Sequence, residues 1–193
     1  MCIRDRLDTQ TFDSAAAESL RRNPNHIEMS ASMYANPHNK ACSAHQLDVM
    51  ILSATEIDTD FNINSLTGST GMIMGALGGA PDTAAGAKLT VVVAPTMRKR
   101  IPIVTDKVTN IVTPGETVDV LVTERGICVN PRRTDLIEKF EAAGIKLKSI
   151  EQLKNEVEKL TGTPERVELT DNIVAVIEYR DGTVIDVVKQ VKE

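Results

Sequence analysis

The order of apolar and polar positions along the chain predicts both strands and helices. The unbroken aliphatic run Leu89–Ala94, stopped by Pro95, predicts a central strand covered on both faces. The mostly apolar run Leu47–Leu52 predicts a second strand. Shorter strands are predicted at Ile101–Val104, Lys107–Val112, Val118–Thr123 and Gly126–Asn130.

Helix signals occur in three segments. Ser14–Arg22 predicts a short helix with Asp13 or Ser14 as its N-cap. Thr134–Ala143 predicts another, capped by Thr134 or Asp135 and followed by Gly144. The sequence from Ser149 to Gln152 is a capping box, which predicts the start of a third helix. The apolar face of that helix comprises Ile150, Leu153, Val157 and Leu160.

The alternation of strands and helices indicates an α/β fold with a largely parallel sheet flanked by helices. Two apolar runs around Arg180-Asp181-Gly182 predict a C-terminal β-hairpin. We therefore expect three parts. Residues 1–6 form a charged leader that matches nothing around it and is not native. Residues 7–165 form an N-terminally truncated α/β domain, and residues 166–193 form a hairpin that packs on the same domain.

Composition and charge narrow the class of protein. Hydrophobic residues make up 41% and charged residues 25%, which predicts a buried core. A net charge of −5 argues against a nucleic-acid or membrane partner, because either requires clustered positive charge. The three cysteines are widely spaced, which predicts no metal site and suits a reducing cytoplasm. No apolar run reaches the roughly 20 residues of a membrane span.

Glycine is concentrated between two predicted strands, with six glycines from Gly68 to Gly86. The segment Gly78–Lys88 predicts a tight turn that feeds a short helix, with Pro81 and Asp82 in its first turn. Free N–H groups at such a turn can bind an anion or an oxyanion. The alternative is a glycine-lined crossover that binds nothing. No nucleotide-binding glycine motif is present.

The same segment resembles a known superfamily. Gly75–Asp82, then Ala87-Lys88 and the strand after it, is similar to the "GGxxD…AK" segment that borders the acyl-CoA site of CoA-transferases. Ser32–Lys40, Ala54–Asn62 and Gly126–Arg133 resemble the citrate lyase α-subunit family. The resemblance runs from about Leu7 to the end of the chain.

The resemblance implies a CoA-transferase-like fold and a citrate CoA-transferase activity. Such an enzyme exchanges acetyl for citryl on an acyl-carrier thioester, so that citrate is cleaved to acetate and oxaloacetate. It implies a β subunit and a γ (acyl carrier) subunit as partners. The CoA-like phosphoribosyl-dephospho-CoA arm of the carrier is then a substrate, and no cofactor is bound directly. Two alternatives stay open: a non-catalytic fragment that binds the carrier or another subunit, and a CoA-transferase for another carboxylate.

The resemblance also implies site residues. The backbone amides of Gly78 and Gly79 are the expected oxyanion donors, worth about 3–4 kcal/mol each in the transition state. Glu56 is not expected to be a nucleophile, because the glutamate used by many CoA-transferases lies upstream of this region. The alternative interpretation makes Glu56 the end of a strand and the asparagines turn residues. The expected substrate- or carrier-binding residues are Glu56, Asn62, Asn64, Asp82 and Lys88.

Overall fold

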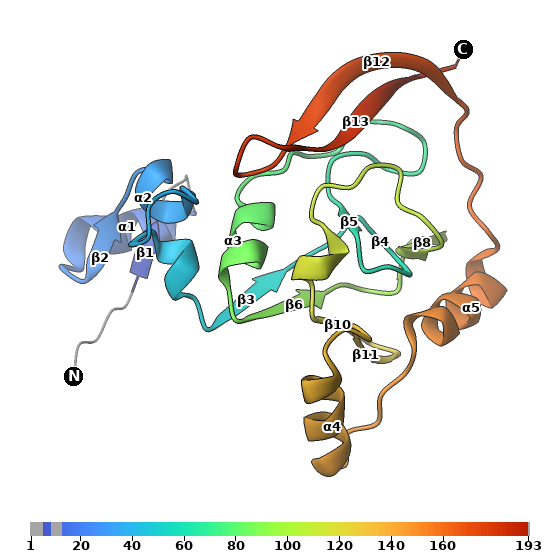
Figure 1. Cartoon of the computed structure of the whole chain (residues 1–193), viewed down its shortest axis with the longest axis horizontal. Helices are drawn as coiled ribbons and strands as arrows, with labels where there is room; N and C mark the ends of the chain where they lie inside the picture. Colours follow the sequence, from blue (N-terminus) through green and yellow to red (C-terminus); the bar gives the residue numbers. More distant parts are fainter. Residues whose placement is uncertain (1–5, 9–12, 193) are drawn as a thin grey trace.

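A computed structural model describes residues 6–8 and 13–192 of the 193-residue chain (Figure 1). It contains a mixed sheet with helices beside it and a long C-terminal hairpin, so the predicted fold class is confirmed. The expected leader, residues 1–6, lies outside the described residues apart from residue 6. Within the described part, no helix is long and apolar enough to cross a membrane.

The main sheet has four strands in the order β11-β10-β6-β3. They are β3 (Val49–Leu52), β6 (Leu89–Val93), β10 (Val120–Thr123) and β11 (Gly126–Val129). The first three are parallel, and β11 returns antiparallel to β10. The run of valines in β6 therefore lies between two neighbouring strands, as its sequence predicted.

A smaller sheet of three short strands lies beside the main one, in the order β5-β4-β9. Strand β4 (Glu56–Asp58) pairs antiparallel with β5 (Ile63–Asn64) and parallel with β9 (Val104–Thr105). Between β6 and β9, β7 (Met97–Arg98) and β8 (Ile101–Pro102) form a short antiparallel pair. Near the N-terminus, β1 (Arg6–Asp8) pairs parallel with β2 (His26–Glu28).

The helices largely follow the sequence signals. The helix at Ser14–Arg22 has its predicted bounds, and Asp13 caps it by accepting from the amide of Ala16. The predicted capping box of Ser149 and Gln152 is present. The helices are α1 (Ser14–Arg22), α2 (Ala31–Ala35), α3 (Ala80–Gly86), α4 (Thr134–Ala142) and α5 (Ile150–Thr161), with 3-10 turns η1 (Ser43–Gln46) and η2 (Gly115–Thr117).

The cap expected for α4 was wrong. Its N-cap is Arg133, with no side-chain cap, instead of Thr134 or Asp135. The Arg133 guanidinium bonds the Asp135 carboxylate at 2.9 Å and the Asp119 carboxylate at 2.6 Å. These two ion pairs tie the Arg133 side chain to both sides of the start of α4.

The expectation that the β6 strand is covered on both faces was also wrong. One face is buried: the register partners Leu52, Val92 and Leu121 are at most 9% exposed and join a core that includes residues of α5. On the opposite face, Ile51 is 65% and Val93 49% exposed. An unbroken aliphatic run indicates a strand with apolar side chains on both faces. Whether each face is buried depends on which other segments pack against it.

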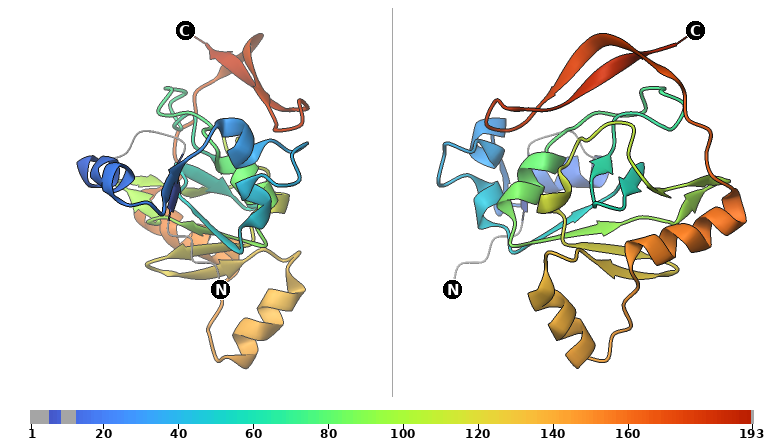
Figure 2. Two further views of the ribbon diagram at one scale, coloured as in Figure 1. Left: turned by 90° about the vertical axis from the view of Figure 1, so that its left-hand side faces the viewer. Right: turned by 45° about the vertical axis from the view of Figure 1, so that its right-hand side comes forward.

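The C-terminal hairpin consists of β12 (Leu169–Glu178) and β13 (Val184–Val191), and it arches over the rest of the chain (Figure 2). The loop after β9 holds it. Asn110 Nδ2 donates to the Val187 carbonyl at 3.0 Å, and the Ile111 amide donates to Asp186 Oδ2 at 2.8 Å. The strand predicted at 107–112 is this loop: three of its amides bond carboxylates, and the Val112 amide donates to the Ile63 carbonyl of β5.

Candidate functional site

The predicted glycine turn is present immediately before α3. Gly78 has φ +54°, a conformation that favours glycine, and a Cβ there would meet nothing within 4 Å. Gly79 is the N-cap of α3, with no side-chain cap. A Cβ at Gly79 would lie 2.7 Å from Cε1 of Tyr34, a residue of α2. The backbone of Gly79 therefore packs directly against an aromatic ring, which explains the need for glycine.

The amides of this turn are available for a ligand. Within the described residues, the N–H groups of Gly78 and Gly79 donate to no acceptor, and the amide of Ala80 reaches the Leu77 carbonyl at 3.4 Å. Pro81 has no N–H to place in the first turn. Unsatisfied N–H groups of this kind can stabilise negative charge on a bound oxygen.

Asp82 lies in the first turn of α3, three residues after Gly79. Its carboxylate is partly buried, and Nε of Arg180 in the hairpin turn lies 3.9 Å from Oδ1. Burial raises the pKa of Asp82, while the charge of Arg180 opposes that rise. The structure therefore brings three of the predicted site residues, Gly78, Gly79 and Asp82, to one turn.

Glu56 and Asn64 form a buried polar pair between β4 and β5. Asn64 Nδ2 donates to Glu56 Oε2 at 2.9 Å and to the carbonyl of Thr67 at 2.7 Å. Thr67 in turn donates to Asn110 at 3.0 Å. Glu56 is 2% and Asn64 0% exposed, so both are held inside the fold and linked to the loop that carries the hairpin.

A cavity of about 100 Å³ lies next to Glu56. Its walls combine the Glu56 carboxylate, the guanidinium-bearing Arg98 and polar Ser69 with apolar side chains. Arg98 is fixed there by donating to the Ala54 carbonyl at 3.1 Å. Opposite charges therefore share one small cavity beside the glycine-rich segment.

Asn62 lies in a tight turn. Its Nδ2 donates to Asp58 Oδ2 at 3.2 Å, and its Oδ1 accepts from the amide of Gly115 at 2.9 Å. Between them Phe61 adopts φ +66°. The Nδ2 atom of Asn62 thus belongs to the turn with Asp58, while its Oδ1 holds the amide of Gly115 in η2.

Lys88 is separated from the other predicted residues, since it follows the carboxyl end of α3 while Gly78 precedes its amino end. Its Nζ lies 2.7 Å from Asp48 Oδ1, and both side chains are more than three-quarters exposed. The hydrogen bond and charge of Asp48 raise the pKa of Lys88. Lys88 is therefore a surface cation.

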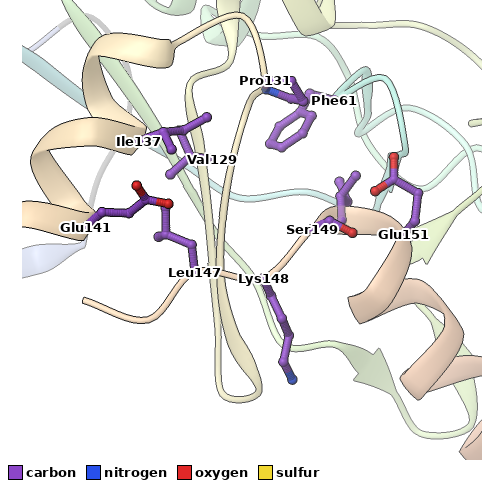
Figure 3. Close-up of a pocket in the computed structure, with 10 residues that line it drawn as sticks. Phe61, Val129, Pro131, Ile137, Glu141, Leu147, Lys148, Ser149 and Glu151 are labelled. Carbon is purple, nitrogen blue, oxygen red and sulfur yellow. The ribbon is translucent and has the colours of Figure 1, made fainter. Parts of the chain in front are cut away.

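A larger cavity of about 230 Å³ lies elsewhere, between α4 and the start of α5 (Figure 3). Its lining is mostly apolar and includes Phe61, Ile137 and Leu147, and in Figure 3 the side chain of Lys148 points away from the phenyl ring. No motif or spacing in the sequence indicated this cavity. Across residues 6–8 and 13–192, no cluster of His, Cys, Asp or Glu is placed to hold a metal ion.

Sequence reasoning missed Tyr34 and Arg180. Tyr34 belongs to one of the segments that carried the family resemblance, which was the available signal. Arg180 is a turn residue 98 positions after Asp82, and nothing in the sequence connects the two.

Comparison with known proteins places these residues in a family context. Residues 2–191 match the model of the family described as citrate lyase, alpha subunit (CitF). The chain is 56% identical to the citrate lyase alpha chains of Klebsiella pneumoniae and Escherichia coli, over 98% and 99% of its length. It spans 37% and 38% of those proteins, so it corresponds to little more than a third of their length.

The chain is also similar to solved structures, one of them from the same family. A crystal structure of the putative α subunit of citrate lyase from Streptococcus mutans, in complex with citrate, is 49% identical with a TM-score of 0.92. The match covers 97% of this chain and 37% of that one. A mutant of RipA is 18% identical, covers 81% of this chain and 37% of its own, and has a TM-score of 0.56, which indicates a shared fold alone.

Proposed function

Because this chain belongs to the citrate lyase α-subunit family, we propose that it forms part of a citrate CoA-transferase site, in which acetyl is exchanged for citryl on an acyl-carrier thioester. The observation that carries the proposal is the turn at Gly78 and Gly79. Its two amides have no acceptor in the described chain, and its sequence is the segment that resembles the acyl-CoA border of CoA-transferases.

The chemistry requires oxyanion stabilisation. In a direct transfer, a citrate carboxylate attacks the carbonyl carbon of the acetyl thioester, the carbon–sulfur bond breaks, and a mixed anhydride and a thiolate form. The thiolate then attacks the citryl carbonyl, giving citryl thioester and acetate. Each attack puts negative charge on a carbonyl oxygen. The amides of Gly78 and Gly79 are fixed donors for that charge, each worth about 3–4 kcal/mol.

The other predicted residues receive different roles in this proposal. Asp82 shapes the turn that carries the amides. Glu56 and Asn64 line and support the inner wall of the small cavity, where Arg98 supplies a cation for a substrate carboxylate. Lys88 is exposed at the surface, where its ammonium group can meet the phosphates of the carrier arm in addition to Asp48. Asn62 supports the wall through its turn.

The same proposal extends to partners and location. Membership of the α-subunit family implies a multi-subunit citrate lyase, for which we propose a β subunit and a γ carrier subunit as the neighbours of this chain. The substrate on the carrier is its phosphoribosyl-dephospho-CoA arm, and we propose that the complex works in the cytoplasm. Citrate as substrate is supported by the related Streptococcus mutans structure, which is a complex with citrate.

An acyl-exchange assay tests the function. An α chain of full family length that contains this sequence is mixed with acetylated carrier and citrate, and citryl carrier and free acetate are measured. Both should form in equal amounts. Carrier binding in a pulldown without exchange would favour the non-catalytic alternative. Exchange with isotopically labelled acetate or with a 3-oxoacid, and none with citrate, would favour a transferase for another carboxylate.

A further inference from the structure

The turn of the C-terminal hairpin brings one arginine into the interior of the molecule. Arg180 lies between β12 and β13, and in Figure 1 this turn of the hairpin lies above α3. Its side chain is 7% exposed, whereas most of the β12 side chains are exposed. Burying a permanently charged guanidinium is costly unless its donors are used, so its contacts are informative.

The guanidinium joins three elements that are far apart in sequence. Nη1 donates to the carbonyl of Asp82 in α3 at 3.2 Å, and Nη2 donates to the carbonyl of Ala35 in α2 at 2.9 Å. Nη2 also lies 2.9 Å from Nε2 of His45 in η1. Because a guanidinium can only donate, that imidazole nitrogen is the acceptor.

The two carbonyls belong to residues on either side of the contact between Gly79 and the Tyr34 ring. Ala35 directly follows Tyr34, whose ring touches Gly79. Asp82 follows Gly79 by three residues in the same helical turn. One side chain therefore bonds the carbonyl of the residue after the ring and a carbonyl in the first turn of the helix that begins at Gly79.

The Nε donor of Arg180 is unused. It is buried and has no hydrogen-bond partner within residues 6–8 and 13–192, while Asp82 Oδ1 lies 3.9 Å away. A buried unsatisfied donor is rare in native proteins and needs a reason. Here an approach of Asp82 by about 1 Å would bring the carboxylate to the length of a charge-assisted hydrogen bond.

We propose that Arg180 is a positioning residue for the Gly78–Gly79 turn, which it sets through its bonds to Ala35 and Asp82, and that its Nε closes on the Asp82 carboxylate when the turn is occupied. The catalytic part of this inference rests on the proposed function. The hairpin has further anchors at Asn110 and Ile111, both of which bond β13. The buried guanidinium ties the hairpin turn to α2, η1 and the first turn of α3.

The test compares Arg180→Lys with Arg166→Lys in an α chain of full family length that contains this sequence. Arg166 also donates to a main-chain carbonyl, that of Lys107, and among the described residues no hydrogen bond or ion pair joins it to α3, so it serves as an exposed control for the arginine-to-lysine change. Lysine keeps the charge of Arg180 and loses the fork that reaches several carbonyls at once. We expect the kcat of exchange to fall roughly tenfold or more with little change in the KM for citrate, since misplaced groups slow the chemical step.

Amide hydrogen exchange supplies a readout that does not depend on activity. The Thr83 amide donates to the Gly79 carbonyl at 3.0 Å and reports on the first turn of α3. Arg180→Lys should speed its exchange and leave the amides of β6 unchanged, whereas Arg166→Lys should change neither. Asp82→Asn should lower kcat as well, and the double variant should be no slower than the slower single variant.

The outcomes separate the two ideas. If the unmodified enzyme fails to exchange citrate, the proposed function fails, and the Thr83 amide alone decides whether Arg180 orders the turn. Unchanged kcat in Arg180→Lys overturns the positioning role, whatever the amides do. Equal losses in both arginine variants, or additive losses in the double variant with Asp82→Asn, also overturn it, because they indicate a general loss of stability or two independent effects.

Discussion

Alanine at Gly79 is the sharpest perturbation of the candidate site. The added Cβ would lie 2.7 Å from Cε1 and 3.1 Å from the hydroxyl of Tyr34. To restore an ordinary contact at 3.4 Å, the ring or the turn must move by about 0.7 Å. Overpacking of this kind costs about 1–3 kcal/mol. A 1 Å misplacement of a catalytic group slows a reaction about 100-fold, so we expect a loss of kcat on the order of 10- to 100-fold.

The assay is acyl exchange between acetylated carrier and citrate, with thermal unfolding measured on the same samples. A fall in Tm of roughly 2–4 °C per kcal/mol would accompany the substitution. Tyr34→Leu combined with Gly79→Ala removes the obstructing ring and should recover both stability and part of kcat. A folded Gly79→Ala enzyme that exchanges citrate at the unmodified rate would refute the reasoning.

Gly144 is a matched control for the effect of backbone strain at Gly78. Both have positive φ, +54° and +72°, and a Cβ at either would meet nothing within 4 Å. Alanine at each should cost about 1–2 kcal/mol of stability through φ alone. We expect Gly78→Ala to lose activity beyond its loss of stability, because its amide belongs to the turn. Gly144→Ala, at the end of α4, should lose stability only.

Three further predictions concern the buried polar groups, the thiol and the open sheet face. Asn64→Leu leaves the buried Glu56 carboxylate without the Nδ2 donor of Asn64. It should lower the free energy of unfolding by about 2–4 kcal/mol in urea titrations. The control Asn172→Leu, at an exposed position, should change that free energy by less than about 0.5 kcal/mol. Burial raises the pKa of Cys128 to about 12, so at pH 8 its thiolate is about 1,000-fold scarcer than that of a thiol with the ordinary pKa. An alkylating reagent should therefore label Cys128 only in urea, as measured by mass spectrometry. Equal labelling of the folded chain would contradict this expectation. Lysine at Ile51, which is 65% exposed on an edge strand, should reduce self-association of the 193-residue chain in sedimentation experiments without lowering its Tm.

Local sequence signals predicted the local structure well. The helix at Ser14–Arg22 and the capping box at Ser149 depend on side chains within four residues of each other, so the chain itself carries the information. The same holds for Gly78, where a tight turn was expected and a positive φ is present. Lys107–Val112 was wrong as a strand because three of its amides bond distant carboxylates, and no local pattern encodes those partners.

The residues of the candidate site also divide into those that are close together in sequence and those that only folding brings together. Gly78, Gly79 and Asp82 belong to one short motif, so their spacing in sequence was enough to bring them together. Arg180 reaches Asp82 across 98 residues, and its place depends on the docking of the whole hairpin. Lys88 belongs to the same motif and lies at the far end of α3, because a helix of seven residues separates the ends of the segment.

The α/β class, the glycine turn and the family resemblance could all be read from the amino-acid sequence, because they depend on short-range backbone preferences and on residues close together in the chain. The covered face of the main sheet, the buried polar groups and the distant side chain that reaches the turn became known only from the folded chain. Those features depend on how segments pack, and packing brings together residues that have no fixed spacing in sequence. Tyr34 against Gly79, and Arg180 against Asp82, are contacts of that kind.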